Sequence, residues 1–141
     1  MKSMKAIFIL AAILTSLQIC KGQNLIGYNI KDIRQYMKNN QKSMVLQGLT
    51  FNNTFRYLKY SDRTQSQTLF FFLSADSVCR SVRLICDKSL KNQKVSELNS
   101  KYTTVGENQW EEEKNGQKYL IDLKDEEWTF NISINIKPLK N

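Results

Sequence analysis

The chain has 141 residues, a formal net charge of +8, three cysteines and no histidine. A chain of this length suits a single domain. Without histidine it lacks the usual base of serine and cysteine catalysis and the commonest metal-binding side chain. Its lysines are scattered rather than gathered in a stripe, so the composition argues against a nucleic-acid-binding protein.

The first 22 residues have the pattern of a signal peptide. Lys2 and Lys5 precede an unbroken apolar run over residues 6–14, and polar and then small residues follow it. The run is far shorter than the roughly 20 residues of a membrane-spanning helix. We therefore expect an exported protein, periplasmic or secreted, with no transmembrane span in the mature chain.

Two processing routes fit the end of this segment. Cys20 and Gly22 are small residues at the −3 and −1 positions if cleavage falls before Gln23. Alternatively, residues 17–20 resemble a bacterial lipobox in which Cys20 is lipidated and anchors the protein to a membrane. Ile19 is bulky where a lipobox prefers a small residue, which favours cleavage before Gln23.

The first half of the remaining chain is predicted to hold one helix and three strands. Helical spacing of Ile30, Ile33 and Met37, with Asn29 as the N-cap, predicts the helix. The polar, asparagine-rich residues 39–53 are predicted to form a long connection. Period-two alternation then predicts strands over residues 55–61, 67–73 and 78–86.

The second half repeats this order. A helix is predicted over residues 89–102, and an Asn115-Gly116 turn between two strand-like runs predicts a hairpin. The three strands of this half are expected over residues 110–114, 117–123 and 128–136.

The two halves align with each other. Residues 68–86 match residues 118–136 in their apolar positions at an offset of 50, without a gap. This self-similarity predicts two halves, about residues 23–87 and 88–141, each with a helix and three strands. Residues 23–141 are therefore expected to form a single α+β domain, a two-layer sandwich with two helices packed on one face of an antiparallel sheet.

Alternation along the strands assigns the aligned apolar residues to the core face of this sheet. Arg80 is the one charged residue in that set, and we expect it at the sheet edge with its stem buried. The opposite face of the first half carries apolar side chains, which often mark interaction surfaces. The candidate partner surface consists of Tyr60, Phe70, Phe72, Arg83 and Ile85. Residues 39–53 could instead fold over this face and cover it.

Cys79 and Cys86 lie seven positions apart on a predicted strand. Seven strand residues span roughly 23 Å, whereas a disulfide needs the two α-carbons within about 7 Å. The odd separation also predicts side chains on opposite faces. We therefore expect two unpaired thiols, with Cys86 buried, and a disulfide would mean that the strand breaks near Arg83. The spacing does not fit a zinc site.

The densest acidic run covers residues 111–113. Glu111 and Glu113 share a strand face, so a hydrolase with paired carboxylates is conceivable. Charge runs of this kind are more typical of a solvated strand face. Since no glycine-rich phosphate loop occurs either, we expect no catalytic residues, no cofactor and no metal.

Parts of the chain resemble small secreted proteins of Bacteroidetes that have no assigned function. The similarity lies in residues 20–28, in the Leu69-Phe70-Phe71-Phe72 run and in residues 78–82. The tandem helix-plus-sheet halves resemble the β-lactamase-inhibitor-protein-like fold and the outer-membrane assembly lipoproteins of the BamE/SmpA type. Proteins of those groups act by binding other proteins, which is a likeness of architecture alone.

Together these features predict an exported, non-enzymatic protein that binds another envelope or secreted protein. The first alternative is a small-molecule or lipid carrier with an apolar pocket between sheet and helices. The second alternative is a lipoprotein anchored through Cys20, and the third is a histidine-free hydrolase that uses Glu111 or Glu113.

Overall fold

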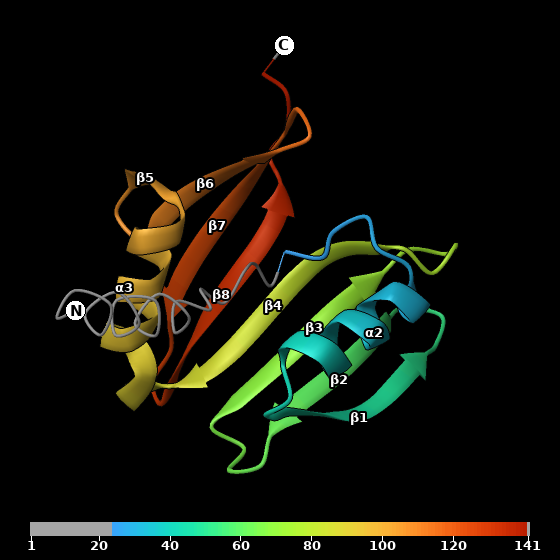
Figure 1. Ribbon diagram of the computed structural model, residues 1–141. Helices are drawn as coiled ribbons and strands as arrows, with labels where there is room; N and C mark the ends of the chain where they lie inside the picture. Colours follow the sequence, from blue (N-terminus) through green and yellow to red (C-terminus); the bar gives the residue numbers. More distant parts are fainter. Residues whose placement is uncertain (1–23, 141) are drawn as a thin grey trace, which may run out of the picture.

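The computed structural model of the protein describes residues 24–140 (Figure 1). The predicted signal peptide, with Cys20, Gly22 and Gln23, lies outside the described residues. No helix within residues 24–140 is both long enough and apolar enough to cross a membrane. In chain order the elements are α2 (Ile30–Asn40), β1 (Met44–Phe51), β2 (Arg56–Asp62), β3 (Gln67–Leu73), β4 (Cys79–Asp87), a 3-10 turn (Lys88–Leu90), α3 (Lys91–Lys101), β5 (Thr103–Gly106), β6 (Gln109–Lys114), β7 (Gln117–Asp125) and β8 (Thr129–Ile136).

The eight strands form one sheet in the order β1-β2-β3-β4-β8-β7-β6-β5, and every neighbouring pair is antiparallel. Each helix precedes four consecutive strands. The last strands of the two runs, β4 and β8, meet at the centre of the sheet, and the first strands, β1 and β5, form its edges. Figure 1 shows the strands running through one continuous, strongly twisted sheet.

The fold class is confirmed as α+β with an antiparallel sheet and two helices, but the predicted even sandwich is not found. The sheet dominates, and the two helices do not form a full second layer made of two halves. Only Ile33 and Met37 of α2 and Leu98 of α3 are buried. Each run also has four strands, where three were predicted.

The two unpredicted strands are the edge strands. Residues 39–53 were expected to be a connection, yet Met44–Phe51 pair with β2 as strand β1. A register shift between Leu46 and Gly48 interrupts their alternation, and this irregularity hides the period-two signal. Strand β5 has four residues, all exposed, so it lacks an apolar face that alternation could reveal.

Both predicted helices are present. The side chain of Asn29 caps α2 as expected, because its Oδ1 atom accepts a hydrogen bond from the backbone N–H of Asp32 at 2.9 Å. The indole Nε1 of Trp110 on β6 donates to Asn99 Oδ1 of α3 at 2.9 Å. This contact fixes α3 beside the strands of the second run.

A short segment before α2 contributes to the core without forming a helix or strand. Leu25 is 2% exposed and Ile26 is also buried. The backbone of Gly27 and Tyr28 exchanges hydrogen bonds of 2.9 Å with Cys79 at the start of β4. The side-chain amide of Asn24 donates to Glu112 Oε2 on β6 at 2.6 Å. The segment therefore links the two runs of strands, which the sequence did not reveal.

One strand has the opposite phase from the prediction. Tyr60 was assigned to the outer face of the sheet, but it is buried in the core together with Leu58. The register pairs Leu58 with Phe71 and Tyr60 with Leu69, both of which are core residues. Strand β2 has apolar residues in both phases, and Lys59 decides between them because its ammonium group has to reach water.

The two cysteines are unpaired, as predicted, but they do not point to opposite faces. Both are fully buried. The register shift between β3 and β4 pairs Phe72 with Ser81 and Leu73 with Cys79, so Arg80 is an extra residue in β4. This bulge restores Cys79 to the core face. Arg80 was expected at the sheet edge with its stem buried, but it lies on the central strand β4 with its side chain 60% exposed, and it forms a 4.0 Å ion pair with Asp76.

Candidate functional site

The most distinctive surface is on the outer face of β2, β3 and β4. In the antiparallel register, Lys59 lies opposite Phe70, which in turn lies opposite Arg83. Two residues further along the strands, on the same face, Tyr57 lies opposite Phe72. Directly opposite side chains are close enough to contact each other. We call these five residues, Tyr57, Lys59, Phe70, Phe72 and Arg83, the aromatic patch.

The three rings of the patch contact one another. The centroids of Phe70 and Phe72 are 5.9 Å apart with an interplanar angle of 15°. Tyr57 meets both rings edge-on, at 5.4 Å from Phe70 and 6.0 Å from Phe72. Aromatic pairs in these arrangements contribute about 0.5–1.5 kcal/mol beyond the area they bury. The rings are therefore held in place by each other and by the sheet before any partner arrives.

Two cations lie against these rings. The Nζ atom of Lys59 is 5.9 Å from the centroid of Phe70, and the guanidinium carbon of Arg83 is 5.6 Å from that of Phe72. Within residues 24–140, neither cation has an ion pair. Each can therefore still pair with an acidic group of a partner while it remains on its ring.

The aromatic patch contains three of the five predicted partner residues. Phe70, Phe72 and Arg83 lie there, and Ile85 lies half-buried on the same face, opposite Thr68. Tyr60 is a core residue and is excluded. Tyr57 and Lys59 were missed, although the charge of Lys59 could have identified the phase of β2. The alternative that residues 39–53 fold over this face is wrong, because β1 extends the sheet sideways.

The patch continues into a polar surface over the second run of strands. The outer face of β8 presents Asn131, Ser133 and Asn135, none of which is buried. A shallow depression of about 290 Å³ lies at the boundary, lined by Phe72, Arg83 and Ser133 among others. Aromatic, cationic and amide side chains thus adjoin one another on one face.

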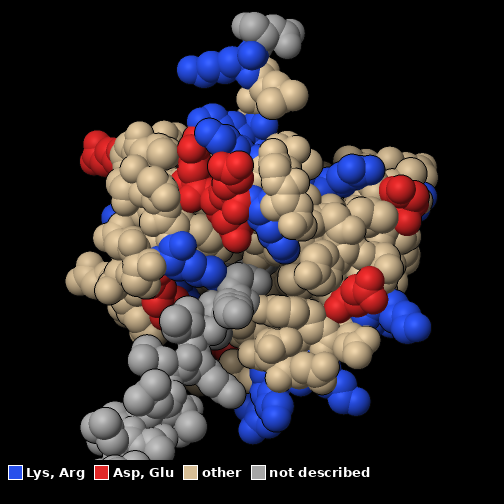
Figure 2. Space-filling view, turned by 45° about the horizontal axis from the view of Figure 1, so that its top comes forward, with Lys and Arg blue, Asp and Glu red and all other residues tan. Residues whose placement is uncertain are grey.

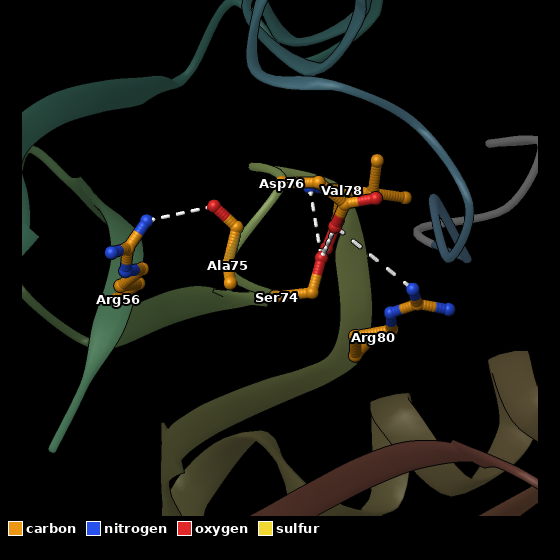
Figure 3. A network of polar contacts seen from close by, with 6 residues as sticks. All are labelled: Arg56, Ser74, Ala75, Asp76, Val78 and Arg80. Atoms are coloured by element: carbon orange, nitrogen blue, oxygen red, sulfur yellow. Dashed lines mark hydrogen bonds and ion pairs between the residues drawn. The ribbon is translucent and has the colours of Figure 1, made fainter.

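A polar network fixes the turn between β3 and β4, at the end of the aromatic patch (Figure 3). Ser74 Oγ donates to Asp76 Oδ1 and accepts from the backbone N–H of Val78 at 3.3 Å. Arg56 Nη1 donates to the carbonyl oxygen of Ala75 at 2.9 Å. The hydrogen bond from Ser74 lowers the pKa of the Asp76 carboxyl group, and so does the nearby Arg80. These contacts hold the strands that carry Phe70, Phe72 and Arg83 in register.

The acidic run on β6 is part of a paired surface. Glu111 forms an ion pair with Lys137, and Glu113 lies opposite Lys118 across the strands. In the space-filling view, the largest group of acidic side chains adjoins basic ones (Figure 2). Glu112 points to the core side and accepts the hydrogen bond from Asn24. This pairing favours a structural role for the run over a pair of carboxylates that act on a substrate.

The core side of the sheet has a pocket of about 470 Å³ between α3, the start of β1 and the central strands β4 and β8. Its floor consists of Leu84, Ile132 and Ile134. Lys94 and Lys101 of α3 also line it. No group of three or more His, Cys, Asp or Glu side chains within residues 24–140 is arranged to hold a metal ion.

Comparison with known proteins found no matching protein family, no matching curated protein and no matching solved structure.

Proposed function

We propose that this protein is an exported, non-enzymatic module of the periplasm or cell envelope that binds another protein through the aromatic patch. The observation that carries the proposal is a cluster of three contacting rings on the outer face of β2, β3 and β4, with two cations that form no ion pair within residues 24–140. Aromatic residues and arginine are enriched in protein interfaces and dominate their binding energy. Presentation from three hydrogen-bonded strands limits the entropy lost on binding.

The positive charge of the patch indicates which class of partner protein it can bind. Lys59 and Arg83 are the charged residues within the patch, and both are positive. A partner with acidic residues would pair with them at little desolvation cost, because both already lie on ring faces. An apolar or aromatic residue of the partner would then occupy the centre of the patch, around Phe70 and Phe72.

The state of the cysteines is compatible with export. Burial raises the pKa of the Cys79 thiol to about 12 and that of the Cys86 thiol to about 11. Thiol exchange needs the thiolate, so buried thiols with a raised pKa react slowly. A pair of such thiols can persist in an oxidising compartment without forming bridges to other chains.

The strand order supports the tandem architecture proposed for the chain. Each helix leads into four strands, and the two runs meet in mirrored order at β4 and β8. We propose that the two runs are equivalent halves, as in the β-lactamase-inhibitor-protein-like and BamE/SmpA-like architectures. Those likenesses would make capture of a protein partner a natural use of the fold.

The buried Asn24 limits how far the domain could lie from a lipid attached to Cys20. Asn24 is 3% exposed and lies four positions after Cys20. Four residues reach at most about 14 Å, so a lipid on Cys20 would hold the domain against the membrane surface. We propose cleavage before Gln23 as the principal route, with Cys20 lipidation as the alternative.

Photocrosslinking in the native host tests the proposed function. A photoreactive phenylalanine analogue replaces Ile85, beside the patch, and in a matched chain it replaces the exposed Gln93 of α3. We expect a discrete protein adduct from position 85 but not from position 93. The double substitution Phe70→Ser and Phe72→Ser should abolish that adduct. An adduct that survives the double substitution, equal adducts from both positions, or no adduct at all would contradict the proposal.

A further inference from the structure

The pocket on the core side of the sheet is a second site, separate from the aromatic patch. It lies over the central strands β4 and β8 next to α3, and Gln41, Ser43 and Met44, which follow α2, close one side. The segment with Leu25 and Ile26 fills another part of the core and does not line it.

The floor of the pocket is apolar, whereas its walls are mixed and include Gln41, Ser43 and Gln67. Leu84, Ile132 and Ile134 form the floor, and Met44, Leu98 and Tyr102 contribute to the walls. Its volume of about 470 Å³ is in the lower half of the range for small-molecule sites, roughly 300–1,000 Å³. A single hydrocarbon chain suits such a space better than a bulky ligand with several chains or rings.

The polar side of the pocket carries more positive than negative charge. Lys94, Lys101 and Glu97 of α3 are its charged lining residues. The side chain of Lys94 is only 13% exposed, and its Nζ atom lies 3.3 Å from Glu97 Oε2. The Nζ atom of Lys101 lies 5.1 Å from the ring centroid of Tyr102. The charged side chains that line the pocket beside its apolar floor are therefore two lysines and one glutamate.

We propose that this pocket binds a single-chain amphiphile with an anionic headgroup. The hydrocarbon chain lies on Leu84, Ile132 and Ile134, and the headgroup pairs with Lys94 and Lys101. Burial of the methylene groups supplies most of the affinity, and the lysines select the sign of the headgroup. This site would make the protein a carrier in addition to the protein-binding role proposed above, and it does not depend on that role.

Fluorescence titration of the delipidated, exported chain tests the charge preference. The probe is parinaric acid, a single-chain fatty acid that is itself fluorescent, compared with the corresponding alcohol and the corresponding trimethylammonium compound. We expect the acid to bind about tenfold more tightly than the alcohol, the difference that one charge-assisted contact supplies. Equal binding of all three probes, or no binding of any of them, would overturn the proposal.

Paired substitutions on α3 locate the probe. Ser96 and Ser100 are both exposed on α3, but only Ser100 lines the pocket. We expect Ser100→Trp to weaken binding of the acid at least about tenfold by filling the pocket, and Ser96→Trp to change it less than about twofold. Lys94→Met should remove most of the preference for the acid over the alcohol. Equal effects at positions 96 and 100, with unchanged thermal unfolding, would show that the probe binds elsewhere.

Discussion

The segment before α2 offers the sharpest test of the fold, because it is buried without being part of a helix or strand. Leu25→Ala removes a side chain that is 2% exposed. The backbone of this segment remains able to make its hydrogen bonds to Cys79. The change therefore isolates the packing contribution of one leucine from the backbone contacts around it.

The expected magnitude follows from the burial. Leucine-to-alanine changes in a core cost about 2–5 kcal/mol, through lost transfer free energy and the cavity that remains. A chain of this size loses roughly 3–5 °C of melting temperature per kcal/mol. We expect Leu25→Ala to lower the melting temperature by about 6–25 °C.

Thermal unfolding followed by circular dichroism measures this change, with Leu139→Ala as the matched control. Leu139 is 90% exposed, so its substitution should leave the melting temperature within about 2 °C. A loss at Leu25 as small as that at Leu139 would refute the reasoning. It would mean that residues 24–28 detach before the sheet unfolds and lie outside its cooperative unit.

Three further predictions concern the sheet, the thiols and the processing of the chain. Phe71→Ala should lower the free energy of unfolding, measured in urea, by about 3–5 kcal/mol because Phe71 is fully buried. Phe72→Ala, on the opposite face, should lower it by about 1 kcal/mol. Equal losses would contradict the assignment of faces. Folding raises the pKa of Cys79 from 9.0 to about 12, so the native state holds this proton more tightly than the unfolded state. Its contribution to stability is complete below pH 9 and is lost as the pH rises toward 12; the urea midpoint should therefore fall over this range, and less steeply in Cys79→Ala. Intact mass of the protein exported by its own host should correspond to a chain that starts at Gln23, and a mass that starts at Cys20 with acyl chains would favour the lipoprotein.

The central strands could be predicted because they have one core face and a strong alternation. In β3 and β4, apolar residues at every second position assigned Phe71 and Leu84 to the core, and the structure confirms both. The bulge at Arg80 was not predictable from alternation, because it exchanges the expected faces of Cys79 and Arg80 while Ser81 and Val82 keep theirs. This bulge is why Cys79 and Cys86 share a face despite their odd separation.

The edges and the first buried segment could not be predicted for a different reason. Strand β1 is bulged and β5 is exposed along its whole length, so neither has a period that sequence alone can show. Leu25 and Ile26 are consecutive residues that are both buried, a pattern that belongs to neither helix nor strand. Their place in the core depends on contacts with β4 and β6, which only the assembled sheet provides.

The two candidate sites also differ in whether a local sequence pattern could predict them. Most of the aromatic patch follows from alternation within β3 and β4, so Phe70, Phe72 and Arg83 could be named from the sequence. Tyr57 and Lys59 of the patch lie on β2, a strand that has apolar residues in both phases. Only the charge of Lys59 shows which phase faces outward. The pocket depends on the gap between α3 and the start of β1, and such spacing between elements leaves no local pattern in the sequence.

The two sites also bear on each other through one strand. Arg83 of the aromatic patch and Leu84 of the pocket floor are consecutive residues of β4 on opposite faces of the sheet. Coupling between two ligands requires that one changes the free energy of binding of the other. Strand β4 is paired on both sides, by β3 and by β8, so it has little freedom to transmit a displacement. A protein held by the patch and an amphiphile held by the pocket should therefore bind independently, which leaves each site free to be tested with the other one occupied.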